Sequence, residues 1–151
     1  MRTVMAENQH YAFVLVLDEK YWNRLCSRNQ TGKEIHAFVR KNQVAPKNAT
    51  KLLFYVKKPL MQVRGTADFI ERLVDDHKAQ WIKFGSETCF ENFEEYSTFI
   101  QGREKVTFVR FKNMVKLQNP LPKEITHSVL CSQRWFRGRY LDKKTTAQLT
   151  I

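Results

Sequence analysis

The 151 residues, of which 42% are apolar, can bury one hydrophobic core, so we expect a single domain over 1–151. The longest apolar run, residues 11–17, is far shorter than the roughly 20 residues of a membrane-spanning helix, and the N-terminus has no apolar stretch of signal-peptide length. We therefore expect a cytoplasmic protein without a membrane partner, and the formal net charge of +11 favours a negatively charged one.

In the first third of the chain, hydrophobic patterning predicts a strand followed by a helix. Residues 11–17 are apolar and rich in aromatic and branched side chains, which is typical of a buried strand. Asp18 can cap a helix that runs to about Arg28, with Trp22 on its apolar face. The segment 33–43 fits either a short helix or an irregular strand.

Strands and helices continue to alternate along the rest of the chain. The connection Lys57-Lys58-Pro59 is too short for a parallel crossover, so the strands that flank it must pair antiparallel. We therefore expect an α+β fold, a small mixed or antiparallel β-barrel with helices packed around it. The remaining expected elements are strands at 51–56 and 60–69, a helix over most of 71–85, a helix at 92–100, a strand at 105–111, an extended piece from Leu121, and a short helix or strand at 143–151, with residues 1–10 and 143–151 at the periphery.

The cysteines and histidines show no pattern of a disulfide framework or a metal site. The three cysteines are odd in number and far apart, and neither they nor the four histidines have the short paired spacing of zinc ligands. We expect reduced, packed thiols and neither a metal nor a cofactor. The residues concerned are Cys26, Cys89, Cys131, His10, His36, His77 and His127.

The charge is concentrated in two basic blocks that also carry aromatic rings. Residues 1–66 and 103–151 each have a net charge of +8, whereas residues 67–102 have −5. Cations bind a phosphate backbone and ring faces stack on unpaired bases, so this mixture favours a nucleic-acid-binding protein. The densest example is Arg134-Trp135-Phe136-Arg137-Gly138-Arg139-Tyr140, where the glycine allows close backbone approach.

Several short stretches resemble a known superfamily. The strand Leu-Leu-Phe-Tyr-Val at 52–56 and the segment Val-Arg-Gly-Thr-Ala-Asp-Phe at 63–69, after a strand and an aromatic-rich helix, resemble the PUA-like superfamily, which includes the EVE, YTH and ASCH domains. The segments at 92–96, 106–109 and 137–141 look most like an uncharacterised archaeal family of stand-alone PUA-like proteins.

This resemblance implies a small β-barrel whose cleft binds RNA or DNA, RNA before DNA, and in some relatives takes one flipped, often methylated base into a ring-lined pocket. EVE and YTH relatives use residues after the first helix and loops across the barrel, although no tryptophan follows the first helix here, where methyl-reading YTH domains place a cage ring. Together with the patterns above, the predicted nucleic-acid contacts are Arg28, Lys33, His36, Lys57, Arg64, Trp81, Arg134, Trp135, Arg137, Arg139 and Tyr140.

Two other functions remain open. Some ASCH relatives hydrolyse small amides or cut RNA with a lysine near a threonine and a glutamate after the first helix, and Thr31, Lys33 and Glu34 lie in a comparable place. Burial would have to lower the pKa of that lysine for it to act as nucleophile or base. A protein-interaction module would instead dock a partner on an acidic helix face, expected on the side away from any phosphate, with Glu87, Glu91, Glu94 and Glu95.

Overall fold

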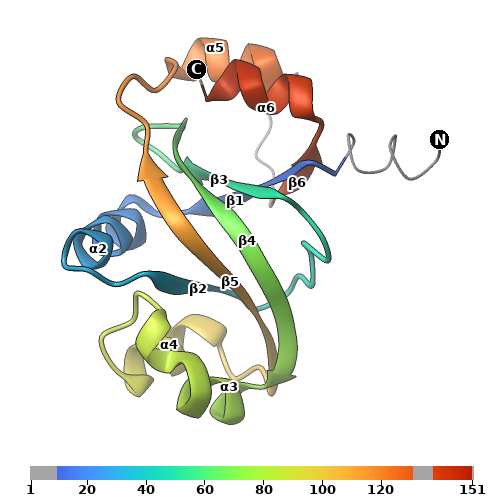
Figure 1. The fold of residues 1–151 in the computed structure, drawn as a ribbon. Coiled ribbons are helices and arrows are strands. Elements are labelled where there is room, and N and C mark those ends of the chain that lie inside the picture. The colour runs from blue at the N-terminus through green and yellow to red at the C-terminus, as the bar shows by residue number, and fades with distance from the viewer. Residues whose placement is uncertain (1–9, 131–137, 151) are drawn as a thin grey trace.

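The computed structural model describes residues 10–130 and 138–150. Within them, six strands form one sheet, and helices cover both of its ends (Figure 1). The strands are β1 (Ala12–Leu17), β2 (Ile35–Arg40), β3 (Lys51–Val56), β4 (Gln62–Asp76), β5 (Lys105–Lys116) and β6 (Arg139–Leu141).

The strand order is β2-β5-β4-β3-β1-β6, and β1 and β3 form the one parallel pair of this sheet. They can run parallel because α2 (Glu19–Gln30), β2 and the segment 41–50 lie between them and give the chain the length to return. The short turn after Lys57 joins β3 and β4 as antiparallel neighbours, as the sequence predicts.

The expected barrel is not formed, because the sheet curls without closing. β2 and β6 are its two edges, and no ladder joins them in the described parts of the chain. The curl still brings the guanidinium of Arg40 on β2 to 5.2 Å from the ring centroid of Phe13 on β1. Phe54 and Phe111, with centroids 5.0 Å apart, and Trp22 of α2 fill its interior. Strands β1 and β2 therefore face each other across a seam without backbone pairing.

Helices pack against opposite ends of the sheet (Figure 1). At one end lie α3 (His77–Phe84), the short 3-10 turn η1 (Gly85–Glu87) and α4 (Phe93–Ile100), and at the other α5 (Lys123–Leu130) and α6 (Lys143–Leu149). Each end has its own buried cluster beneath its helices, and a third buried cluster fills the interior of the curled sheet around Trp22. The sheet therefore carries apolar residues on both faces. None of the helices among the described residues is long and apolar enough to cross a bilayer.

Most of the elements expected from the sequence are present. Strands occupy most of 11–17 and 51–56, β5 covers 105–111, and α2 and α4 lie where helices were expected. The segment 33–43 contains β2, which resolves the choice between helix and strand. The last expected element, at 143–151, contains α6.

The helix expected over 71–85 begins later than predicted. Residues 71–76 continue β4, because Leu73 pairs with Phe108 and the strand has a long partner in β5. The helix α3 starts at His77, and the Asp76 carboxylate before it accepts hydrogen bonds from the second and third backbone N–H groups of the helix.

The extended piece expected from Leu121 was also wrong. The chain forms α5 there, and Thr126 and Leu130, both 0% exposed, are the residues that this helix buries. Tertiary packing therefore decides this segment, since its few apolar residues give a weak pattern along the sequence.

Candidate binding pocket between β1, β2, α2 and α4

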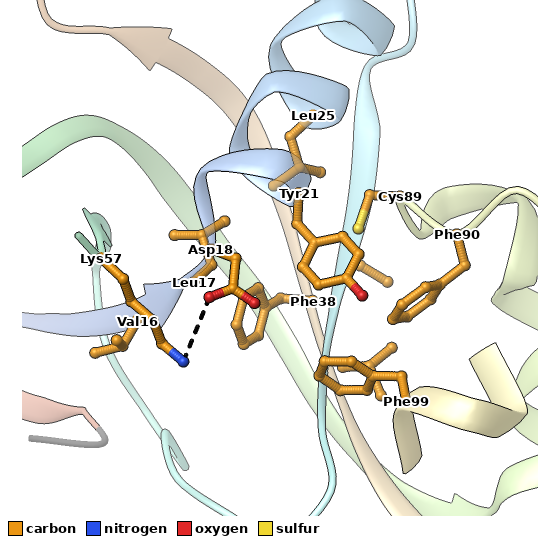
Figure 2. Close-up of a pocket in the computed structure, with 12 residues that line it drawn as sticks. Val16, Leu17, Asp18, Tyr21, Leu25, Phe38, Lys57, Cys89, Phe90 and Phe99 are labelled. Carbon is orange, nitrogen blue, oxygen red and sulfur yellow. Dashed lines mark ion pairs between the residues drawn. The ribbon is translucent and has the colours of Figure 1, made fainter. Parts of the chain in front are cut away.

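A pocket opens along the seam between β1 and β2. It lies between the end of β1, the middle of β2, the first turn of α2, α4 and the segment before α4, and its volume is about 90 Å³. Its walls are mainly apolar, with an aspartate and a lysine beside the rings (Figure 2). The ring-bearing residues are Tyr21, Phe38, Phe90 and Phe99, and the charged ones are Asp18 and Lys57.

The turn from β1 into α2 directs Tyr21 into the pocket. Asp18 is extended, and its carbonyl accepts the backbone N–H of Tyr21 at 3.1 Å, which starts the helix directly after the buried end of β1. The Tyr21 ring lies edge-on to Phe90 (5.5 Å) and Phe99 (5.8 Å), and these two rings are 5.1 Å apart. The three rings therefore hold one another in place, so this wall is largely formed before a ligand arrives.

The polar groups of the pocket suit binding better than nucleophilic chemistry. Asp18 Oδ1 and Lys57 Nζ are 3.6 Å apart, and both side chains are exposed, so their mutual attraction is worth about 1 kcal/mol or less. Burial raises the pKa of Tyr21, so its hydroxyl stays neutral and can donate or accept a hydrogen bond. Burial also raises the pKa of Cys89 to about 11, which keeps its thiol protonated and unreactive at neutral pH.

Cations from α2 and from the loop after it hold one wall of the pocket. That wall is the segment 85–92, which carries two of the lining residues. The three hydrogen bonds run from Arg24 Nη1 to the Cys89 carbonyl (3.4 Å), from Arg28 Nη2 to the Phe90 carbonyl (3.3 Å), and from Lys33 Nζ to the Ser86 carbonyl. These side chains thus satisfy backbone carbonyls of the segment that joins α3 to α4.

Glutamates of the acidic block, residues 67–102, support the same wall. We expected them to lie on the side away from the site. Glu87 accepts two hydrogen bonds from Arg110, at 2.8 and 2.9 Å. Glu95 accepts one from Arg24 at 2.5 Å, which holds the pKa of Glu95 below its usual range, and Glu91 lies 3.4 Å from the same guanidinium. The acidic residues therefore neutralise arginines behind the pocket.

Four of the predicted nucleic-acid contacts lie at or near the pocket. Lys57 lines it, and Arg28 and Lys33 hold its wall. His36 is fully buried on β2, with Nε2 3.3 Å from Asn29 Oδ1. Burial lowers the pKa of His36, so it is a neutral packing residue in the folded protein.

Two further predicted contacts lie away from the pocket. Trp81 stacks on Tyr96 at 4.9 Å, in the cluster that joins α3 and α4 to the sheet. Arg64 on β4 donates to Gln62 on the same strand at 2.9 Å.

The C-terminal basic cluster is described in part. Arg139 donates to the Leu130 carbonyl at 2.8 Å, on the side of the sheet that α5 covers. Tyr140, the next residue on β6, packs edge-on against Phe13 and stacks with His10. The other three predicted contacts, Arg134, Trp135 and Arg137, lie outside the described residues.

The residues of the hydrolytic alternative have separate contacts. The Thr31 hydroxyl donates to the Arg28 carbonyl at 2.9 Å, Lys33 is half-buried and donates to Ser86, and Glu34 is exposed. A nucleophile and its base must lie within hydrogen-bonding reach of each other. In the described residues, no group of three or more His, Cys, Asp or Glu side chains could hold a metal ion.

Sequence reasoning missed most of the pocket. The ring of Phe99 belongs to a helical pattern with Tyr96, and Tyr21 lies on the apolar face of α2, so both read as core residues. Phe38 and Phe90 fall in segments that the sequence leaves without a clear element. The one available signal was the high share of aromatic residues, 13% of the chain, which indicates many rings and does not show where they meet.

The fold is that of ASCH domains. Three solved structures, of the ASCH protein from Zymomonas mobilis and of two single-residue mutants of it, superpose with TM-scores of 0.76 to 0.77. They are 18% identical to this chain, and the match covers 91 to 93% of it and 93 to 95% of theirs. At this identity the likeness shows the fold alone, and this fold agrees with the one that the ASCH part of the resemblance implied. No protein-family model and no curated protein sequence matches the chain.

Proposed function

We propose that this chain binds single-stranded nucleic acid, RNA in preference to DNA, and holds one unpaired base in the pocket between β1 and β2. The observation that carries the proposal is a pre-formed, ring-lined pocket with a lysine beside it, on a chain with a net charge of +11. Ring faces bind bases of any sequence by stacking, and cations bind the phosphates between them.

The size of the pocket suits one ring of a base. An apolar cavity of about 150 Å³ encloses a whole benzene molecule. The pocket here has about 90 Å³ and is open to solvent on one side, so a heterocycle can insert one edge and leave the sugar outside. A base inside a duplex cannot reach such a pocket without being flipped out, which favours single-stranded ligands.

The pocket offers polar partners at its entrance and apolar surface further in. Asp18 accepts hydrogen bonds, Lys57 donates them, and the Tyr21 hydroxyl can do either. A base presents donors and acceptors along one edge and apolar faces on both sides, so it matches this division. The ring walls would also accommodate a methylated base, as in some PUA-like relatives.

A matched pair of ring variants tests the pocket. Phe99→Ala removes one wall of it, whereas Phe93→Ala removes a ring from the same helix that packs on Trp81 and His77 outside the pocket. We expect Phe99→Ala to weaken single-stranded RNA binding about five- to 150-fold, the range of one base–ring stack, and Phe93→Ala to bind like the wild type. Fluorescence anisotropy with a labelled single strand measures both, and equal affinities of the two variants would refute the pocket.

Neighbouring lysines test the phosphate contact. Lys57 lines the pocket and Lys58 is exposed beside it. The logarithm of the affinity for a single strand should fall with the logarithm of the salt concentration by about 0.7 per phosphate bound. We expect Lys57→Ala to reduce that slope by one such step and Lys58→Ala to leave it unchanged. A wild-type affinity for RNA that does not depend on salt would favour the protein-interaction alternative.

A further inference from the structure

A pair of stacked rings lies beyond the other end of β1 from the pocket. The rings of His10 and Tyr140 are 4.1 Å apart between centroids and inclined by only 21°. The Tyr140 ring is fixed from two directions, because Phe13 packs edge-on against it at 4.9 Å and its hydroxyl accepts the backbone N–H of Lys47 at 2.8 Å. His10 is exposed. The pair is therefore a rigid tyrosine with an accessible imidazole stacked on it.

The ring pair and the pocket lie along the same seam. Tyr140 pairs with Phe13 near the start of β1, and the pocket is lined by Leu17 at the end of β1. Four residues of a strand span about 13 Å. Roughly four nucleotides stacked at ~3.4 Å cover this distance, and an unstacked, extended strand covers it with fewer nucleotides.

Cations lie along this seam and at both of its ends. Lys57 is at the pocket, and Lys47, whose backbone binds Tyr140, has an exposed side chain. Arg40 lies between them over Phe13, buried and bound to the Ala45 carbonyl. Burial lowers its pKa to about 10, so it remains charged at neutral pH and adds to the positive potential without contacting the ligand. A chain of phosphates between the two ends would thus run past positive charge.

We propose that the His10–Tyr140 ring pair is a second base subsite, on which a base a few nucleotides away from the one in the pocket stacks against His10. The inference rests on the proposed function, because it places a second part of the same ligand on this seam and so sets the minimum length of that ligand. The ligand class is a single-stranded oligonucleotide long enough to reach both ends of β1. A third ring on an existing stack needs no change in the protein, because the tyrosine beneath is already held.

Ligand length separates the two subsites. We expect the affinity of the wild type for oligouridylates to rise steeply with length until both subsites are filled, and then to level off. His10→Ala should bind uridine monophosphate like the wild type, but should bind the longer oligomers about five- to 150-fold more weakly. His10→Trp, which enlarges the ring, should tighten the binding of long oligomers alone.

The control is Ile82→Ala, which removes an 83% exposed side chain from α3, at the end of the sheet away from β6 (Figure 1). Long oligomers that bind His10→Ala and Ile82→Ala equally would overturn the second subsite while Phe99→Ala still tests the first. An affinity that does not rise with length would also overturn it. A wild type that binds no single strand at low salt would overturn this inference and the proposed function together.

Discussion

The ion pairs of Arg110 hold the wall of the pocket to the sheet, and replacing this arginine tests how strongly. Arg110 on β5 binds Glu87 of η1 through Nε and Nη2 and Glu71 of β4 through Nη1, at 2.5 Å. Its guanidinium also lies 4.6 Å from the ring centroid of Phe84. The side chains of Arg110 and Glu87 are only 16% and 17% exposed, and their geometry is bidentate. These carboxylates raise the pKa of Arg110, so it is charged at every accessible pH.

The cost of Arg110→Ala follows from leaving Glu87 without its partner. Removing one member of a buried ion pair costs about 3–5 kcal/mol, and the slight exposure of this pair favours the lower end, about 3 kcal/mol. Glu71, with 41% exposure, adds less than about 1 kcal/mol. For a chain of this length, 1 kcal/mol shifts the melting temperature by about 2–4 °C. We therefore expect Arg110→Ala to melt about 6–12 °C below the wild type.

Thermal unfolding followed by circular dichroism measures this change, with Lys112→Ala, an exposed cation on the same strand, as the control. We expect the control to shift the melting temperature by less than about 2 °C. A second variant, Arg110→Leu with Glu87→Leu, removes both charges and should recover most of the lost stability. A melting temperature of Arg110→Ala equal to that of the control, or no recovery in the double variant, would refute the reasoning.

Three further changes test the packing, the pH dependence and the helix capping of the fold. Gly65→Ala would place a Cβ 2.8 Å from the Val115 carbonyl and against Trp22, so we expect a loss of about 1–3 kcal/mol in chemical denaturation, and an unchanged midpoint would contradict this packing. Because burial holds the pKa of His36 below its unfolded value of about 6.5, the folded protein binds fewer protons, and the free energy of unfolding should fall as the pH drops from about 7 toward 5. His36→Gln should flatten that fall, and the same pH dependence in the variant and the wild type would show that His36 does not cause it. Asn92 caps α4 by accepting the third backbone N–H of the helix at 2.8 Å, so Asn92→Ala should lower the melting temperature by about 2–4 °C, and no shift would show that the cap is dispensable.

Local patterns were sufficient for elements that carry their own signal. The apolar run that became β1 and the aspartate after it are both local signals, so the strand and the start of α2 could be predicted. Asp18 does occupy the N-cap position, but its side chain makes no capping hydrogen bond. The end of β4 could not, because Glu71 and Arg72 read as a helix start in sequence. Their strand conformation comes from pairing with β5, more than thirty residues later in the chain.

The pocket was hidden for a related reason. Its rings come from α2, β2, the segment 85–92 and α4, and none of these pieces has a motif that points to the others. Their convergence depends on the curl of the sheet, which brings β2 opposite β1 without pairing to it. A sequence pattern shows which face of an element is apolar, and it cannot show that two apolar faces meet around a space.

The net charge of a stretch of sequence does not show which of its cations are already paired in the folded protein. The acidic block of residues 67–102 is separate from the basic blocks along the chain, yet the fold inserts its glutamates between the arginines of α2 and β5. Arg24 and Arg110 are therefore neutralised, and Arg28 donates a hydrogen bond to the Phe90 carbonyl. An arriving phosphate would have to break these contacts, which are more buried than the exposed ion pair of Lys57 with Asp18. The net charge attracts the polyanion, whereas the bound phosphates should meet cations such as Lys47 and Lys57, whose side chains lie at the surface of the seam.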